Sequence, residues 1–355
     1  MKIKAVKVAK FIIFLLVLLV VIELLLHTII YVYYSRVQFD ENFHHIYIPH
    51  LNRTERFSNY TSDFVINSDG FRSAEYNYSK QNGTNRIIVI GDSITSNNAA
   101  RSDRMYTTVL ANDINEKSKL RWEVINRGVE GWGTDNEYLY YVKDGYKYKP
   151  DIVILQFTIA NDFSDVMLNN MTYIENGTMF IKDKYSQPTA LDKIKLFLNQ
   201  KSGLYRIFAS FIVPFYTNIA NKGTYTAYGT ASYIETTKNV FNSTKFLLDR
   251  LNNYSSRNGT KFLVVINDDA RGVNKEYYDY WNKIHKNYIS QEEMSRPRMI
   301  LIEYLNSRNI SYIDTSSVVT ELDDYVSIYD GHFSVKGSEK IGNFIYSKMK
   351  DIGLV

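Results

Sequence analysis

The chain has no cysteine among its 355 residues. This absence excludes disulfides, cysteine-ligated zinc and a cysteine nucleophile, so the folded part must be stabilised by its hydrophobic core. Net charge is also missing beyond the N-terminus, because residues 37–355 carry 37 basic and 37 acidic side chains. Nucleic-acid binding needs a basic face, and we therefore expect no nucleic-acid partner.

Long apolar runs are scarce, with one exception at the N-terminus. An almost unbroken apolar stretch runs over residues 11–34 after four lysines, and as a helix it would be about 35 Å long. Its aromatic end, residues 31–36, contains no small-residue cleavage site. The pattern predicts a cytoplasmic basic tail (1–10), an uncleaved transmembrane signal anchor (11–34) and an extracytoplasmic remainder, so that the protein is single-pass with its N-terminus in the cytoplasm.

Two polar residues interrupt this apolar stretch. Glu23 and His27 are four residues apart and share one face of a helix. In one interpretation Glu23 is neutral and His27 lies at the membrane surface; in the other, the pair contacts a membrane partner protein.

Beyond residue 36 the sequence divides at about residue 86. Residues 35–85 have no sustained hydrophobic period and predict an extended extracytoplasmic stem that packs on the domain, with a tight turn at Asn67-Ser68-Asp69-Gly70. From residue 86 to 355, short β-branched runs alternate with helical patterns, which predicts a parallel sheet with helices on both faces. The expected strands are 86–90, 122–126, 151–157, 261–267 and 310–314, and the expected helices are 104–119, 135–144, 237–257, 291–308 and 335–350.

Two local features within this domain carry further predictions. Thr134 and Glu137 have the spacing of a capping box, which predicts the start of the second helix. An insertion over about 165–236 is rich in Tyr, Phe and Asn, and its apolar centre at 204–216 is too short and too interrupted to span a bilayer. The insertion could be a helical cap over the site, a patch on the membrane or an ordinary packed helix.

The first expected strand ends abruptly at Gly91-Asp92-Ser93. A buried parallel strand delivers such residues to the carboxyl edge of the sheet, where open α/β folds keep their sites. Ser93 is therefore the candidate nucleophile, although Gly-Asp-Ser alone is also an ordinary turn.

Two further strand ends converge on the same edge. The second strand leads into a glycine-rich loop that contains Gly131, and the third leads to Asn161-Asp162. Acyl transfer needs hydrogen-bond donors aimed at the developing oxyanion. The N–H groups of Ser93 and Gly131 and the side chain of Asn161 would serve, although Asn161-Asp162 could also be only a helix cap.

Histidine is scarce, with six in the chain, and one of them stands near the C-terminus in Asp330-Gly331-His332. A carboxylate two residues before a histidine in an extended segment projects to the same side. Asp330 could thus hold one imidazole nitrogen of His332 while the other faces Ser93. Seen alone the segment could be a turn, and the stem histidines His44, His45 and His50 are not expected to bind metal.

These four segments, in this order over about residues 86–350, resemble the four blocks of the SGNH/GDSL hydrolase superfamily. The stem phrase at 67–72 also resembles a segment found in membrane-anchored members. The resemblance implies a three-layer α/β/α, flavodoxin-like fold with a parallel sheet. It also implies roles for five residues, with supporting parts for Asp92 and Asp162. Ser93 would be the nucleophile, His332 the base and Asp330 its orienting acid, while Ser93, Gly131 and Asn161 would form the oxyanion hole.

The chain departs from the family pattern at two points. Ile159 stands where the third block usually has glycine, and Asp330 lies two rather than three residues before the histidine, with Asp323 and Asp324 as reserve candidates. The absence of a second glycine after Ser93 argues against the α/β-hydrolase fold.

The expected function is a membrane-anchored extracytoplasmic serine esterase without cofactor or metal. Family members often remove acetyl groups from glycans, so the expected substrate is an acetylated surface polysaccharide, followed by lipid esters. The same residues could transfer the acyl group to a sugar hydroxyl, and a non-catalytic glycan-binding protein is the third alternative.

Overall fold

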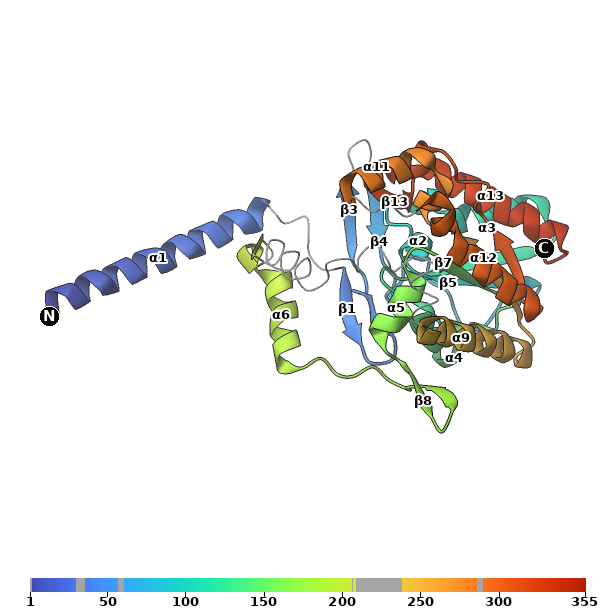
Figure 1. The fold of residues 1–355 in the computed structure, drawn as a ribbon, viewed down its shortest axis with the longest axis horizontal. Coiled ribbons are helices and arrows are strands. Elements are labelled where there is room, and N and C mark those ends of the chain that lie inside the picture. Colours follow the sequence, from blue (N-terminus) through green and yellow to red (C-terminus); the bar gives the residue numbers. More distant parts are fainter. Residues whose placement is uncertain (1, 30–35, 57–60, 206, 209–237, 286–289) are drawn as a thin grey trace. The chain divides into compact units, whose positions relative to one another are not determined.

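The computed structural model describes residues 2–29, 36–56, 61–205, 207–208, 238–285 and 290–355 (Figure 1). The chain forms two compact units, one from Met1–Arg36 with Ser186–Tyr225 and one from Val37–Tyr185 with Thr226–Val355. The second unit contains all the residues that the sequence predicts to be catalytic or to form the oxyanion hole.

A five-stranded parallel sheet forms the centre of the larger unit, in the order β11-β10-β7-β5-β6. This is the flavodoxin-like order, in which the direction of winding changes between the first and third strands, here β5 and β7. The fold class predicted from the sequence is therefore correct for this unit. The five strands are β5 (Thr84–Gly91), β6 (Arg121–Gly128), β7 (Ile152–Thr158), β10 (Lys261–Asn267) and β11 (Ser311–Asp314).

Helices cover both faces of the sheet and close a separate apolar core on each. Leu139 of α4, Leu248 of α9 and Leu301 of α12 belong to one core. Leu110 of α3 and Ile345 of α13 belong to the other. The helices are α3 (Tyr106–Lys117), α4 (Thr134–Lys143), α9 (Lys238–Arg257), α12 (Gln291–Ser307) and α13 (Val335–Asp351), all close to their predicted ranges.

Shorter elements connect these layers. They are α2 (Ser93–Ser96), α10 (Ala270–Val273), α11 (Lys275–His285), the 3-10 turns η2 (Ser102–Arg104), η3 (Gly145–Tyr148) and η4 (Leu322–Asp324), and the hairpin of β12 (Tyr325–Ser327) and β13 (Asp330–Phe333). The α2 helix follows β5 directly, and β13 leads into α13, so both lie at the carboxyl edge of the sheet.

The segment expected to be an extended stem is instead largely folded into two antiparallel hairpins. β1 (Val37–Asp40) pairs with β2 (His44–Tyr47), and β3 (Asn52–Arg56) pairs with β4 (Thr61–Val65). Tyr47 and Phe64 are fully buried in the core of the larger unit, so tertiary packing stabilises strands that their own polar composition does not predict. The expected turn is present, since Gly70 donates its N–H to the Asn67 carbonyl and has a φ of +84°.

The predicted capping box of α4 is wrong. The residue before the helix is Gly133, and its N–H donates to the side chain of Asn136 at 2.9 Å. Glu137 is fully buried, and neither of its carboxylate oxygens has a hydrogen-bond partner in the described part of the chain. Glu137 therefore packs beneath the sheet edge rather than capping the helix.

The insertion contains regular structure on both sides of its centre. α5 (Asp162–Asn169) is followed by a hairpin of β8 (Thr172–Glu175) and β9 (Thr178–Ile181), and then by α6 (Ala190–Lys201). Most of the apolar centre at 204–216 lies outside the described residues.

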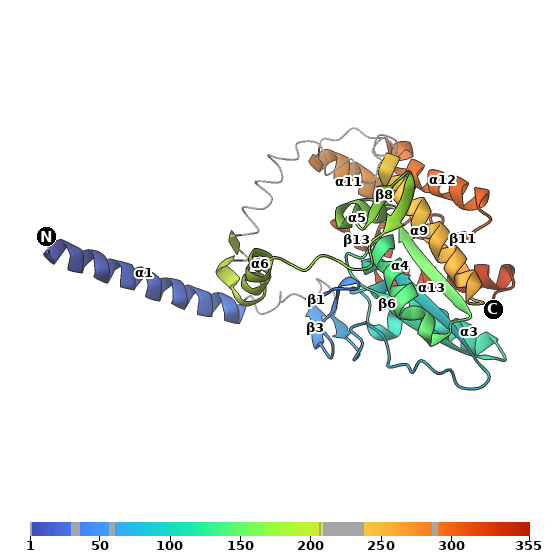
Figure 2. The ribbon, with the colours of Figure 1, turned by 90° about the horizontal axis from the view of Figure 1, so that it is seen from below.

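The smaller unit consists of α1 (Lys2–Ile29) and α6 with the residues that follow it (Figures 1 and 2). Glu23 of α1 accepts hydrogen bonds from the N–H groups of Gly203 and Leu204 at 2.6 and 3.0 Å, and from the Ser202 hydroxyl at 3.1 Å. Glu23 thus has its partners within the same chain. Over the described residues, no helix meets the combined length and hydropathy of a membrane span.

Candidate active site

Ser93 is placed by a tight connection between β5 and α2. Asp92 caps α2, because its Oδ1 accepts the Ile94 N–H at 2.8 Å. A Cβ atom at Gly91 would lie 2.2 Å from Thr95 Oγ1, so only glycine lets the short helix fold back onto the end of the strand. Ser93 is the first residue of α2 and is half-buried at the sheet edge.

His332 lies between Ser93 and Asp330. Its Nε2 is 2.8 Å from Ser93 Oγ, and its Nδ1 is 2.5 Å from Asp330 Oδ1. The same carboxylate oxygen accepts the His332 backbone N–H at 3.0 Å. The structure therefore brings together three residues that the sequence separates by up to 239 positions, with the two-residue spacing of Asp330 and His332 in β13 sufficient for the contact.

The environment keeps Asp330 ionised and makes His332 a stronger base. Burial acts to lower the pKa of His332, but the hydrogen bond and charge of Asp330, with the nearby charges of Asp92 and Glu130, outweigh it and raise the pKa above its usual value. Burial acts to raise the pKa of Asp330, and its contact with His332 lowers it overall. The reserve candidates are not in this position: Asp323 contacts Lys336, and Asp324 contacts Lys340.

Asn161 follows β7 and lies beside Asp92. Its Nδ2 donates to Asp92 Oδ2 at 3.0 Å and to Asp165 Oδ2 at 2.7 Å. Ionised carboxylates accept, and the NH₂ end of the amide faces both of them. Both amide hydrogens are thereby donated, and an oxyanion would have to replace one of these carboxylates.

The loop that carries Gly131 is held by the folded stem. His45 Nε2 lies 2.7 Å from the Glu130 carbonyl, and the Tyr47 hydroxyl accepts the Glu130 N–H at 3.0 Å while donating to Ser96 at 2.9 Å. Gly131 has a φ of +77°. Among the described residues, the N–H groups of Ser93 and Gly131 donate to no other group, which leaves them as donors.

Sequence reasoning missed His45, Tyr47 and Glu130. Their positions depend on contacts across 83 and 85 residues, and no local pattern in the stem marks them.

Asp162 holds the end of β7 in place next to the site. Its Oδ2 accepts the Thr158 N–H at 2.7 Å at the end of β7. It is fully buried with Asp92, Asp135 and Glu137, and Asp165 lies beside them. Burial and mutual repulsion raise the pKa of Asp162 and Glu137 well above the usual carboxyl value, and raise that of Asp165 to about 7.

A cleft of about 370 Å³ opens above Ser93 and His332. One side of the cleft comes from the segment after β10, the next from α11, and the third from the turn between β12 and β13. Its lining includes Asn161, Asp269, Arg271, Tyr277, Trp281 and Tyr329.

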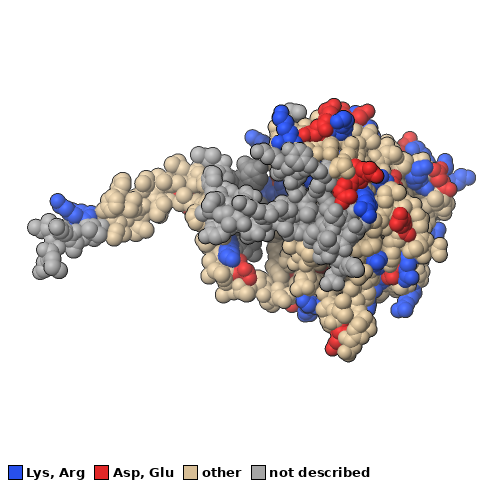
Figure 3. Space-filling model, in the orientation of Figure 1, with Lys and Arg blue, Asp and Glu red and all other residues tan. Residues whose placement is uncertain are grey.

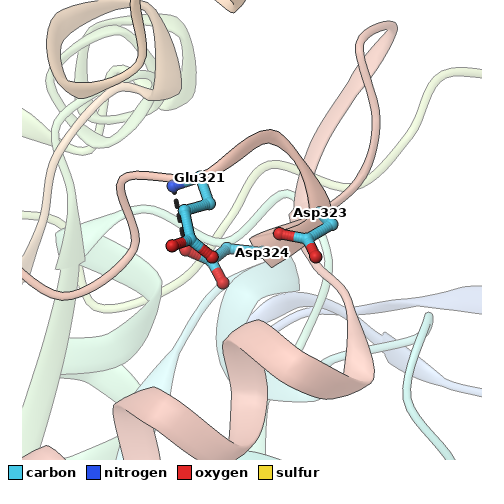
Figure 4. A group of neighbouring side chains, drawn as sticks. All are labelled: Glu321, Asp323 and Asp324. Carbon is cyan, nitrogen blue, oxygen red and sulfur yellow. Dashed lines mark hydrogen bonds between the residues drawn. The ribbon is translucent and has the colours of Figure 1, made fainter.

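A second group of carboxylates lies away from this cleft, at Glu321, Asp323 and Asp324 (Figure 4). Asp324 accepts the Glu321 N–H at 3.0 Å, and Lys336 bonds Glu321 and Asp323 while Lys340 bonds Asp324 and Glu321. Two lysines thus bond the three carboxylates, which fasten η4 to α13 and, among the described residues, show no feature of a metal centre beyond their proximity.

In comparisons with known proteins, the chain is similar to solved structures only. No protein-family model matches the chain, and no curated protein matches its sequence. Among solved structures, it is similar to a Clostridium thermocellum family 3 carbohydrate esterase (13% identity, 76% of this chain and 96% of that one, TM-score 0.41). It is also similar to an acetyl-xylooligosaccharide esterase from Geobacillus (14%, 76% and 94%, 0.42) and to an aryl esterase of M. smegmatis (14%, 75% and 99%, 0.42).

Proposed function

We propose that this chain is a serine ester hydrolase of the SGNH/GDSL type. The observation that carries the proposal is the continuous row from Asp330 through His332 to Ser93, with contacts of 2.5 and 2.8 Å at the carboxyl edge of a parallel sheet. Nucleophile, base and orienting acid in hydrogen-bond contact are the minimum for acyl transfer through a serine.

The proposed reaction has two halves. Ser93 Oγ attacks the ester carbonyl as its proton moves to His332 Nε2, and His332 then gives this proton to the departing alcohol. Water then attacks the acyl-serine as its proton moves to the same nitrogen, and His332 returns this proton to Ser93 Oγ as the acid leaves, which restores both residues. Asp330 accepts the Nδ1 hydrogen throughout and stabilises the imidazolium.

The main donors to the oxyanion would be backbone N–H groups. The N–H groups of Ser93 and Gly131 have no other acceptor among the described residues, whereas the Asn161 amide is already engaged by Asp92 and Asp165. Removing one oxyanion donor from a hydrolase costs about 10²–10³ in kcat, so access to Asn161 would strongly affect the rate.

Labelling of the full-length protein with a fluorophosphonate tests the proposal. We expect Ser93 to be labelled, Ser93→Ala and His332→Ala to abolish both labelling and the release of acid from p-nitrophenyl acetate, and Asp323→Ala to retain both. Labelling without hydrolysis, but with acyl transfer to an added sugar, would favour the transferase alternative. A folded wild-type protein that is not labelled would leave the non-catalytic alternative.

We also propose that α1 tethers the protein to a membrane with residues 37–355 outside the cytoplasm. Large apolar side chains from Phe11 to Val21 are 40–61% exposed all round this helix, and Lys7 and Lys10 precede them (Figure 3). A continuous exposed apolar surface of this kind marks a membrane or protein interface. Protease treatment of intact cells tests the export: digestion of a C-terminal epitope supports it, and protection of the epitope contradicts it. Extraction of membranes with alkaline carbonate tests the tether, and release of the protein contradicts it.

A further inference from the structure

His45 of β2 lies against the loop that carries Gly131. Its Nε2 is 2.7 Å from the carbonyl oxygen of Glu130 and 3.7 Å from the position that a Cβ atom of Gly131 would take. The Glu130 carbonyl and the Gly131 N–H belong to one planar peptide group, in which they point in opposite directions. His45 therefore holds one end of the peptide whose other end is a proposed donor to the oxyanion.

This peptide is the centre of a type II turn over residues 129–132. The Trp132 N–H donates to the Val129 carbonyl at 3.2 Å. Gly131, at the third position, has a φ of +77°, whereas Glu130, at the second, does not have a positive φ. Glycine also fits the third position of a type I turn, which the chain adopts when the central peptide rotates by about 180°. That rotation would reverse the Gly131 N–H and remove it from the oxyanion hole.

The His45 contact is compatible with only one of these two orientations. A carbonyl oxygen only accepts, so Nε2 of His45 carries a hydrogen and donates it to Glu130. With the peptide reversed, this donor would face the N–H of Gly131 instead of an acceptor, which is unfavourable for a partly buried group. His45 thus favours the type II turn.

His44 supports the tautomer that His45 needs. Burial lowers the pKa of both imidazoles, and the charge of His45 further lowers that of His44, to about 4, so both rings are neutral at pH 7. Neutral His45 with its hydrogen on Nε2 has a lone pair on Nδ1, and this atom lies 2.7 Å from Nδ1 of His44. His44 therefore donates to His45, which donates to Glu130, and the two hydrogen bonds strengthen each other.

Buried contacts of the hairpin fix the position of His45 itself. Its backbone carbonyl accepts the indole N–H of Trp132 at 2.8 Å, and the Tyr47 hydroxyl accepts the Glu130 N–H at 3.0 Å. Trp132 and Tyr47 are fully buried. The hairpin thus holds the loop at both peptides of Glu130, with Tyr47 on one and His45 on the other.

We propose that His45 is a positioning residue of the oxyanion hole, which keeps the peptide between Glu130 and Gly131 in the orientation that aims the Gly131 N–H at the oxyanion. The inference rests on the proposed esterase function and gives the hairpin of β1 and β2 a part in the reaction. A hydrogen bond accepted by the carbonyl also polarises the N–H at the other end of the peptide, so His45 strengthens this donor as well as aiming it. Both effects act on charge that develops in the transition state, and they should change kcat rather than KM.

Kinetics of two variants of the full-length protein test the proposal. His45→Phe keeps a ring but has no N–H, and we expect kcat for p-nitrophenyl acetate to fall about 10- to 100-fold with KM within about twofold of wild type. His45→Gln places an amide N–H where Nε2 stood, and should recover kcat to within about threefold of wild type. Gln38→Ala, which changes an exposed residue of β1 in the same hairpin, is the matched control and should behave as wild type.

A transition-state analogue separates positioning from a structural role. Phenylboronic acid adds to a nucleophilic serine as a tetrahedral anion, and its Ki should rise in His45→Phe by the factor by which kcat/KM falls. Equal losses of kcat in His45→Phe and His45→Gln, or a loss of kcat with an unchanged Ki, would overturn the proposal.

Wild-type kcat in a folded His45→Phe variant would also overturn the proposal, but it would leave the esterase intact. His45→Leu replaces His45→Phe if the latter does not fold. Failure of the esterase itself is seen separately, because the wild type would then not be labelled at Ser93 by a fluorophosphonate, and this outcome would overturn both.

Discussion

At the scale of single residues, two carboxylates compete with the expected oxyanion for the amide hydrogens of Asn161. Asn161, which the family resemblance assigns to the oxyanion hole, donates both amide hydrogens to carboxylates. Asp92 is fully buried and also caps α2, so this contact is fixed. Asp165 is only partly buried and makes the contact that can exchange.

Asp165→Ala should therefore increase activity. The substitution frees one hydrogen of Asn161 for the oxyanion and removes a nearby carboxyl that is about half ionised at pH 7, and both effects stabilise the transition state. We expect kcat for p-nitrophenyl acetate to rise by up to about tenfold at pH 7 with little change in KM. A fall in kcat would instead mean that Asp165 positions the amide, and Asn161→Ala is the control that must lower the rate in either case.

The pH dependence should follow His332. Catalysis needs the neutral imidazole, and the pKa of His332 is raised above its usual value by Asp330, so activity should fall as the pH drops below a midpoint above about 6.5. Asp330→Asn removes the charge that raises this pKa. We expect the acid limb of kcat/KM to move to lower pH while kcat falls at least about 100-fold. An unchanged acid limb would assign the titration to another group.

At the scale of elements, the sequence predicted what short-range patterns determine. The runs at 86–90 and 261–267 are β-branched and buried, and they form β5 and β10 within two residues of the expected ends. The hairpins of the stem were missed because β3 is polar, Asn-Arg-Thr-Glu-Arg, and pairs only where β4 and the core support it. The two carboxylate partners of Asn161 come from different elements, so no sequence spacing reveals that they meet.

The contact between α1 and the segment after α6 can be tested by cross-linking, since the chain has no cysteine. A Cβ atom at Gly203 would lie 2.8 Å from the Cβ of Leu26. A disulfide holds its two Cβ atoms about 3.8 Å apart, so the backbone at residue 203 must move outward by roughly 1 Å. With that small shift, Leu26→Cys with Gly203→Cys should form an intramolecular disulfide on mild oxidation. Adding Glu23→Leu should reduce its yield several-fold, because the three hydrogen bonds to residues 202–204 are lost. Leu19→Cys with Gly203→Cys is the control that should not react.

At the scale of the whole molecule, the carboxyls buried beneath the site should govern stability against pH. Burial and the charges of Asp92, Asp135 and Asp165 raise the pKa of Glu137, so the folded protein keeps a proton that the unfolded chain loses above about pH 4.3. Folding stability therefore decreases as the pH rises from this value toward the folded pKa.

Glu137→Gln removes the part of this pH dependence that is due to Glu137. We expect its advantage over wild type in free energy of unfolding to grow as the pH rises above about 5, by up to about 1.4 kcal/mol for each pH unit. Urea denaturation at several pH values measures this difference. Glu116→Gln, an exposed site on α3, is the control. A constant difference across this range would contradict the burial of a protonated Glu137.

The long separation between Ser93 and His332 also has a consequence for biosynthesis. The base that activates Ser93 lies 239 residues further along the chain. Domains fold as the chain emerges from its N-terminal end, and contacts between distant residues form late. An incompletely synthesised or incompletely exported chain would therefore contain the serine without its base. The order of residues itself delays the onset of activity until the C-terminal helix has joined the sheet.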